Sequence, residues 1–216
     1  MNKIVIDNKE NVIDSYIGCV NVSEVCNKLS VSGTCKLYFL DNIKDLTIDV
    51  LDNANLEMYM YSDNKNFDSI VVINQFSNTN LRLYDAFKSA SDVKESIVTN
   101  ILGSNNKTNI DIRIVQIDGH SEVLEQINAK ENTNNNEAVE LLKGLVCGGA
   151  ITTLPNMEIG TNNIVANHFV TISSYDKNEL FYLMSKGIDL NLAKELIKSG
   201  YLFNKVDEKF KEVFYE

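Results

Sequence analysis

The chain has 216 residues, of which 44% are hydrophobic and 23% charged, and its formal net charge is −10. This size and composition fit one sizeable globular core, and no apolar run approaches the ~20 residues that a membrane span requires. The negative charge and the scattered Lys and Arg residues argue against a nucleic-acid partner, and the amino terminus lacks the apolar region of a signal peptide. We therefore expect a cytoplasmic protein that acts without a membrane or a nucleic acid.

The first part of the chain shows no clear period. The apolar residues between 15 and 30 fit either a short amphipathic helix or a first irregular coil of a larger structure. Cys19, Cys26 and Cys35 fall in or beside this segment, and none of the four cysteines forms the C-x₂-C pair of a zinc site. In a reducing compartment we expect buried apolar thiols rather than disulfides.

Short runs in the middle of the chain alternate between apolar and other residues, which indicates strands with one buried face. Asn-rich turns introduce three of them, and the first apolar residues of these runs, Leu56, Leu81 and Ile110, recur at a loose period in the twenties. A repeat of this length with one turn motif per repeat is typical of a β-solenoid, although an ordinary antiparallel sandwich fits the alternation as well. The runs are Leu46-x-Ile48-x-Val50, Leu56-x-Met58-x-Met60, Leu81-x-Leu83 and Ile110-x-Ile112-x-Ile114.

The carboxy-terminal part is helical in pattern. Asp176 begins a capping box ahead of an apolar stretch, and Gly187 stands where a helix C′ glycine belongs. A second helix is expected from Asp189 or Asn191 to Gly200. A third short helix is expected to hold Val206, Phe210 and Val213.

The most specific signal lies between Pro155 and Phe203. Its pieces, in order, are Pro155, Met157-Glu158-Ile159, His168, Leu180-Phe181-Tyr182-Leu183-x-Ser185-Lys186-Gly187-Ile188, Ala193 and Gly200-Tyr201. Their order and intervals resemble the carboxy-terminal signature of the SufB/SufD family, the scaffold proteins of the Suf iron–sulfur cluster assembly machinery. The resemblance covers roughly the last third of the chain and is not visible before about Glu137.

The resemblance implies a fold and a division of the chain. The SufB/SufD core is a right-handed parallel β-helix, so a mainly β solenoid with a carboxy-terminal helical subdomain is expected here. The β-helix would occupy residues 1–173, with irregular first coils over about 1–35. The helical subdomain would occupy residues 174–216. For the ambiguous segment 84–102, the family favours strands.

The resemblance also implies a site for cluster assembly at a subunit interface. His168 takes the place of a family histidine and becomes the candidate cluster or iron ligand, since neutral imidazole binds iron. SufB-type members have a cysteine at a set interval before this histidine and a glutamate directly after it. Those places fall on Glu140 and Phe169, so the chain looks more like a SufD-type or divergent minimal member. Cys147 is a weaker candidate as a substitute thiol. The competing interpretation is that His168 only hydrogen-bonds within its strand.

In this family the helical region docks SufC, an ABC-type ATPase. Exposed aromatic and aliphatic side chains are the usual anchors of such an interface, and Lys186 stands where the family has an arginine, supplying a point charge instead of a bidentate fork. Leu183, Leu196 and Ile197 are expected to pack inside the subdomain. The candidate partner-binding residues are Phe181, Tyr182, Met184, Lys186, Leu190 and Tyr201.

The expected function is that of a non-enzymatic scaffold in iron–sulfur cluster assembly. It would hold a cluster transiently, bind no cofactor tightly, and form a homodimer or a heterodimer with a SufB-type paralogue. One alternative is a structural adaptor of the Suf complex that binds no iron. A less favoured alternative is a β-solenoid enzyme such as a sugar-active lyase, which would need Asp, Arg, Lys or His clustered on one face. The two histidines, His120 and His168, stand far apart in the chain and offer little support for it.

Overall fold

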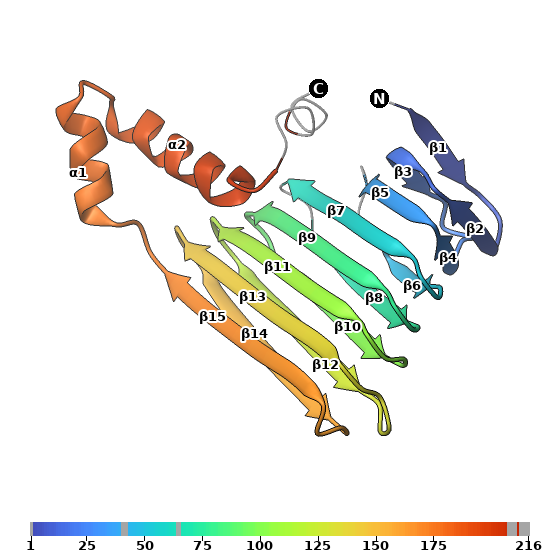
Figure 1. Ribbon diagram of the computed structural model, residues 1–216. Helices are drawn as coiled ribbons and strands as arrows, with labels where there is room; N and C mark the ends of the chain where they lie inside the picture. The colour runs from blue at the N-terminus through green and yellow to red at the C-terminus, as the bar shows by residue number, and fades with distance from the viewer. Residues whose placement is uncertain (1, 40–42, 64–65, 207–210, 212–216) are drawn as a thin grey trace.

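The strands of the chain coil alternately into two parallel sheets, followed by two helices (Figure 1). The computed structural model describes residues 2–39, 43–63, 66–206 and 211. The strands are β1 (Lys3–Ile6), β2 (Glu10–Asp14), β3 (Ile17–Val22), β4 (Lys28–Ser32), β5 (Thr34–Phe39), β6 (Asp45–Val50), β7 (Asn55–Asp63), β8 (Phe67–Gln75), β9 (Asn80–Ser89), β10 (Val93–Ile101), β11 (Lys107–Gln116), β12 (His120–Ala129), β13 (Asn136–Val146), β14 (Ala150–Ile159) and β15 (Ile164–Ser173). The helices are α1 (Lys177–Ser185) and α2 (Leu190–Phe203).

Odd-numbered strands form an eight-stranded sheet, called sheet A here, and even-numbered strands form a seven-stranded sheet, sheet B. Every pair of neighbouring strands in both sheets is parallel. Each coil therefore contributes one strand to each sheet, and the apolar core lies between the sheets. The predicted β-solenoid with a helical end is confirmed.

The coils differ in length, so the register between strands differs at one place from the register that the sequence repeat indicated. Leu56 pairs with Leu81, as the sequence spacing suggested, but Leu81 pairs with Thr108 rather than Ile110. Thr108 faces the interior, where its hydroxyl donates a hydrogen bond of 2.6 Å to Gln75. A polar residue in an inward position is invisible to an apolar pattern, so the sequence repeat was misplaced by two residues.

Asparagine residues form a ladder along one corner of the solenoid. Asn53, Asn78, Asn105 and Asn135 all have positive φ, between 55° and 65°. Each side-chain amide donates to the asparagine of the preceding coil, over 3.2, 3.0 and 2.9 Å in turn. Asparagine tolerates the left-handed conformation better than other non-glycine residues. The Asn-rich turns thus fix both the corner geometry and the stacking of successive coils.

Both helices begin at the predicted caps. The side chain of Asp176 accepts from the backbone N–H of Asn178 over 2.7 Å, and Asp189 accepts from Asn191 and Leu192. Gly187 has φ +86° and ends α1. The predicted end of α2 at Gly200 was wrong: the helix continues to Phe203 because Leu202 and Phe203 are buried against the outer face of sheet A.

A charged cluster fastens the end of α2 to sheet A. Asp111 on β11 accepts from the Arg113 guanidinium and lies 2.6 Å from the Lys205 amine just beyond the helix. The hydroxyl of Tyr84 donates to the backbone carbonyl of Leu202. Since Asp111 and Arg113 are almost fully buried, removing Asp111 would leave the Arg113 guanidinium without its carboxylate partner inside the structure. The helix is therefore held by buried polar contacts as well as by apolar packing.

The fold also decides the structure of several segments for which the sequence left alternatives. Residues 15–30 form strands β3 and β4 and no helix, while residues 84–102 form β9 and β10, as the family favoured. The three cysteines of the first segment are buried free thiols, as expected. Of the third expected helix, Val206 is buried, whereas Phe210 and Val213 lie outside the described residues. Pro155 lies on β14, an edge strand, where the missing N–H is tolerated.

The asparagine ladder gives a first prediction. Asn105→Ala should lower the free energy of unfolding by about 1–3 kcal/mol, because it loses ladder hydrogen bonds and places a Cβ-bearing residue without a local polar group at positive φ. Asn105→Gly loses the same hydrogen bonds, but glycine adopts positive φ without the steric cost of a Cβ atom. Urea unfolding of the three proteins should therefore rank the wild type above the glycine variant and the glycine variant above the alanine variant. Equal stability of the two variants would contradict the role of the backbone.

Candidate functional site

The two candidate ligands Glu140 and His168 are lateral neighbours in sheet A. Glu140 on β13 pairs directly with His168 on β15, so the interval between them in the sequence is the length of one coil. Both belong to the inward column that contains Ile110 on β11. Glu140 is fully buried, whereas His168 is exposed because β15 is the last strand of the sheet. The structure thus brings these two predicted residues together at the open end of the solenoid.

A second carboxyl faces this site from the opposite sheet. Glu125 on β12 is fully buried, and none of the carboxylate oxygens of Glu125 and Glu140 accepts a hydrogen bond from a donor among the described residues. Two carboxylates only accept, so a hydrogen bond between them requires a shared proton. Burial, together with the nearby Glu140, raises the pKa of Glu125 to about 10. Burial also raises the pKa of Glu140, while Glu125 and His168 oppose that rise.

Sequence reasoning missed Glu125 although a signal was available. Val123, Glu125 and Ile127 alternate along β12, and the first and last of them are core residues. The parity of the strand places the glutamate inside. Asp85 on β9 and Glu95 on β10 form a second buried acidic pair by the same rule, and it was missed as well. The sequence analysis considered only the apolar members of each alternating run and so did not assign the charged residues at inward positions.

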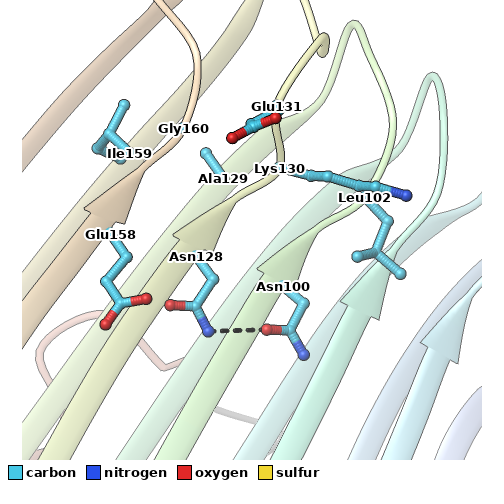
Figure 2. Close-up of a pocket in the computed structure, with 9 residues that line it drawn as sticks. All are labelled: Asn100, Leu102, Asn128, Ala129, Lys130, Glu131, Glu158, Ile159 and Gly160. Carbon is cyan, nitrogen blue, oxygen red and sulfur yellow. Dashed lines mark hydrogen bonds between the residues drawn. The ribbon is translucent and has the colours of Figure 1, made fainter.

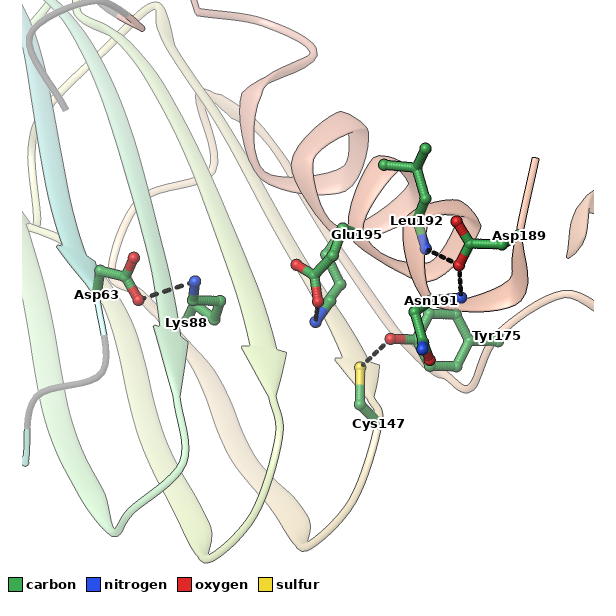
Figure 3. A network of polar contacts seen from close by, with 9 residues as sticks. Asp63, Lys88, Cys147, Tyr175, Asp189, Asn191, Leu192 and Glu195 are labelled. Carbon is green, nitrogen blue, oxygen red and sulfur yellow. Dashed lines mark hydrogen bonds and ion pairs between the residues drawn. The ribbon is translucent and has the colours of Figure 1, made fainter. Parts of the chain in front are cut away.

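Cys147 lies away from the candidate ligands. It follows the end of β13, seven residues beyond Glu140, or roughly 20 Å along the strand at the usual rise per residue. Its thiol is half-buried and donates to the hydroxyl of Tyr175 over 3.1 Å (Figure 3). The structure therefore places Cys147 at the junction with the helices and not beside His168.

The predicted partner-binding residues divide into two groups. Phe181, Tyr182, Met184 and Leu190 are exposed, with Phe181 at 74% and Tyr182 at 60%. Lys186 lies over the Tyr182 ring, 5.5 Å from its centroid. Tyr201 is instead partly buried between α2 and sheet A.

The helices also expose apolar residues that the sequence assigned to the interior or passed over. Leu192 and Leu196 are about half exposed, so the expected internal packing of Leu196 was wrong, while Ile197 is buried as expected. None of the residues of α1 is buried. Figure 1 shows α1 standing beyond the edge of the sheets, where a loop connects it to β15 and α2 follows it. The helical end thus presents an uncovered apolar surface, defined by Phe181, Tyr182, Met184, Leu190, Leu192 and Leu196, which we call the helical face.

Two of the surface hollows that contain polar residues lie near the carboxy-terminal end of the solenoid or on the outer face of sheet A. One of about 390 Å³ lies beside the hydrogen-bonded Asn100 and Asn128 and is bordered by Glu131 and Glu158 (Figure 2). Another of about 310 Å³, on the outer face of sheet A, includes Asp111, whose charge Arg113 and Lys205 already neutralise. Neither includes a predicted site residue. Within the described part of the chain, no three His, Cys, Asp or Glu side chains are grouped as ligands of a metal, and no helix is long and apolar enough to cross a membrane.

Comparison with known proteins places the carboxy-terminal part of the chain. Residues 128–201 match the sequence model of a protein family described as "SUF system FeS cluster assembly, SufBD core domain". This stretch of the chain, called the SufBD stretch here, is therefore similar to the SufBD core domain. The iron–sulfur cluster assembly protein SufD of Plasmodium berghei (strain Anka) is 33% identical over 75 residues, which is 32% of this chain. The shared stretch is 6% of that relative's length. The SufBD stretch runs from the end of β12 to α2 and contains Glu140, His168 and the helical face.

The buried carboxyl of Glu125 gives a prediction about pH. Its pKa rises from about 4.3 in the unfolded chain to about 10 in the fold. The protonated form is therefore favoured by folding, so its contribution to stability is complete below about pH 4.3 and is lost as the pH rises toward 10. Glu125→Gln should flatten the fall of unfolding free energy between pH 5 and 8, by up to ~1.4 kcal/mol per pH unit. Urea unfolding at several pH values measures this.

The matched control is Glu122→Gln on the same strand, whose side chain is about half exposed. It should leave the pH dependence of the wild type unchanged. An equal flattening by both substitutions would show that the effect is not due to the buried position of Glu125.

Proposed function

We propose that this chain is a non-enzymatic scaffold component of iron–sulfur cluster assembly that works with a SufC-like ABC ATPase. The observation that carries the proposal is the extent of the SufBD match, residues 128–201. It covers the end of the solenoid, with Glu140 beside His168, and both helices with the helical face. The two parts that the family role requires, a ligand site and a docking surface, therefore lie in one continuous stretch.

The proposed cargo is iron or a transient iron–sulfur cluster held at His168 and Glu140. The exposed imidazole can bind iron as a neutral ligand, and Glu140 can ligate only after it loses its proton. Carboxylate is a harder ligand than the thiolates that hold iron–sulfur clusters. Sulfur ligands would therefore come from a second subunit, which favours a heterodimer with a cysteine-bearing SufB-type paralogue over a homodimer. Cys147, seven residues along the strand from Glu140, plays no part in this proposal.

The edge of β15 is the proposed surface for that second subunit. β15 is the terminal strand of sheet A, so one side of its backbone lacks a neighbouring strand among the described residues. Phe169, Val170 and Ile172 on this strand are exposed. An open strand edge with apolar side chains is a natural site for pairing with another chain. Such pairing would enclose His168 between two subunits.

The helical face is the proposed docking surface for the ATPase. Phe181 and Tyr182 would be its aromatic anchors, with Lys186 as a flanking charge. ATP binding would bring two ATPase subunits together and would act on the solenoid through the contacts of the α2 end with β9 and β11. We place the complex in the cytoplasm. The alternative role of an adaptor without iron uses the same helical face but not His168, so the two roles can be separated by experiment.

Replacement of the histidine tests the iron site. In the complex reconstituted anaerobically with iron and sulfide, His168→Ala should lower the cluster yield about tenfold or more, because a direct ligand is lost. The matched control is His120→Ala, which removes an exposed histidine whose ring nitrogen forms a hydrogen bond with Thr152. Cluster absorbance and bound iron measure the yield. An unchanged yield with His168→Ala would overturn the ligand role and favour the adaptor.

Substitution on the helical face tests the docking surface. Phe181→Asp should weaken binding of the SufC-like ATPase at least tenfold, since it places a charge at the centre of an apolar contact. Val12→Asp changes an equally exposed apolar residue at the opposite end of the solenoid and should leave the affinity unchanged. Calorimetric titration measures both. Failure of the wild-type chain to bind the ATPase would contradict the proposed function as a whole.

A further inference from the structure

A small polar cavity lies in the solenoid. Asp85 on β9, which lines it, is two coils from Glu140 on β13 and three from His168 on β15. The volume of the cavity is about 20 Å³, and it is lined by side chains of β7, β8, β9 and β10 and by Ile43. Four of the lining residues are polar: Ser62, Ser69, Asp85 and Glu95. Apolar side chains, including Met60 and Phe67, form the rest of its wall. The cavity therefore gathers carboxyl and hydroxyl oxygens within a core that is otherwise apolar.

The polar side chains around this cavity are more than nine-tenths buried and incompletely satisfied. Asp85 Oδ2, Glu95 Oε2 and Ser62 Oγ have no hydrogen-bond partner among the described residues. Glu95 and Ser69 are lateral neighbours in sheet B, and Asp85 pairs with Met60 in sheet A. The two sheets thus bring two carboxyls and two hydroxyls to one point. Leaving such groups without a partner costs free energy, and buried charges are generally paired or bound to a metal.

The size and the donors of the cavity restrict what it can hold. Its volume suffices for about one water molecule or one ion, since one water occupies roughly 10–15 Å³ by this measure. Two ionised carboxyls carry a charge of about −2, which a divalent cation neutralises. Burial raises the pKa of Asp85 to about 6, and burial together with Asp85 raises that of Glu95 well above its usual range. Without a cation the pair therefore keeps protons, and a bound cation would displace them.

We propose that this cavity binds one calcium-class divalent cation through the carboxylates of Asp85 and Glu95 and the hydroxyls of Ser62 and Ser69. Two bidentate carboxylates and two hydroxyls supply about six oxygen ligands, which lies within the range of Ca²⁺. Mg²⁺ usually keeps several of its waters, for which the cavity has no room. Zinc and copper prefer nitrogen or sulfur ligands, and none of the four polar side chains provides them. The ion would join sheet A to sheet B within the core.

This site is distinct from the proposed site of cluster assembly. It lies on β7 to β10, whereas Glu140 and His168 lie on β13 and β15. Its expected effect is on the stability of the solenoid, and it does not depend on the ATPase or on a second subunit. The proposal therefore stands or falls without the proposed function.

The test uses the full-length chain, freed of metal with a chelator and titrated with Ca²⁺ or Mg²⁺ in separate calorimetric experiments. We expect one Ca²⁺ per chain, a higher melting temperature with Ca²⁺, and at least tenfold weaker binding of Mg²⁺. Glu95→Gln should weaken Ca²⁺ binding at least tenfold. Ser62→Ala, which removes one neutral ligand and leaves both carboxyls, should weaken it several-fold and keeps the test valid if the first variant does not fold.

The control is Glu122→Gln, which changes a half-exposed glutamate outside this cavity and should bind Ca²⁺ as the wild type does. Absence of Ca²⁺ binding by the wild type would overturn the proposal. So would equal affinity for Mg²⁺, or an equal loss of affinity in the Glu122→Gln control.

Discussion

Parallel stacking of successive coils is the constraint on which the rest of the structure depends. Each residue of a coil lies beside its counterpart in the next coil, so an inward position must suit the whole column in which it stands. Apolar columns such as Leu83 and Ile110 form the core. Polar residues at the corners bond to their counterparts, as the asparagine ladder shows. One register thus decides packing, corner geometry and the place of every buried polar group.

The same constraint leaves inward-facing side chains exposed at the end of the solenoid, on its last strand. The stack of described coils ends at β15, and no further coil packs over the inward residues of this strand. His168 is exposed and Glu140 is buried for this reason alone, although the two are neighbours in one column. The helices do not cover this end, because α2 lies on the outer face of sheet A and is held there by Asp111, Arg113 and Lys205. The proposed docking surface and the proposed ligand site are therefore separate within the SufBD stretch.

Buried carboxyls distinguish this solenoid from a purely apolar one. Glu125 and Glu140 face each other near the open end, and Asp85 and Glu95 line a cavity closer to the amino terminus. An unpaired ionised carboxyl costs several kcal/mol in such surroundings, so each pair must share protons or hold a cation. The two pairs differ in their neighbours. The first lies next to an exposed histidine, while the second is accompanied by serine hydroxyls. That difference underlies the separate roles proposed for them.

The sequence by itself determined the strands, the helical end and the motifs that resemble the SufB/SufD family. The alternation fitted an antiparallel sandwich as well, and only the resemblance favoured the solenoid. Alternation in the runs around Met58 and Ile112, together with Asn-rich turns, is local information, and so are the caps Asp176 and Asp189. The register between distant coils was only approximate, because Thr108 is polar yet inward and coil lengths differ. The tertiary structure alone decided that Glu140 stands beside His168, that Glu125 faces Glu140, and that Asp85 and Glu95 meet in one cavity. These groups come from different strands, and their proximity depends on a register that only the stacked coils establish.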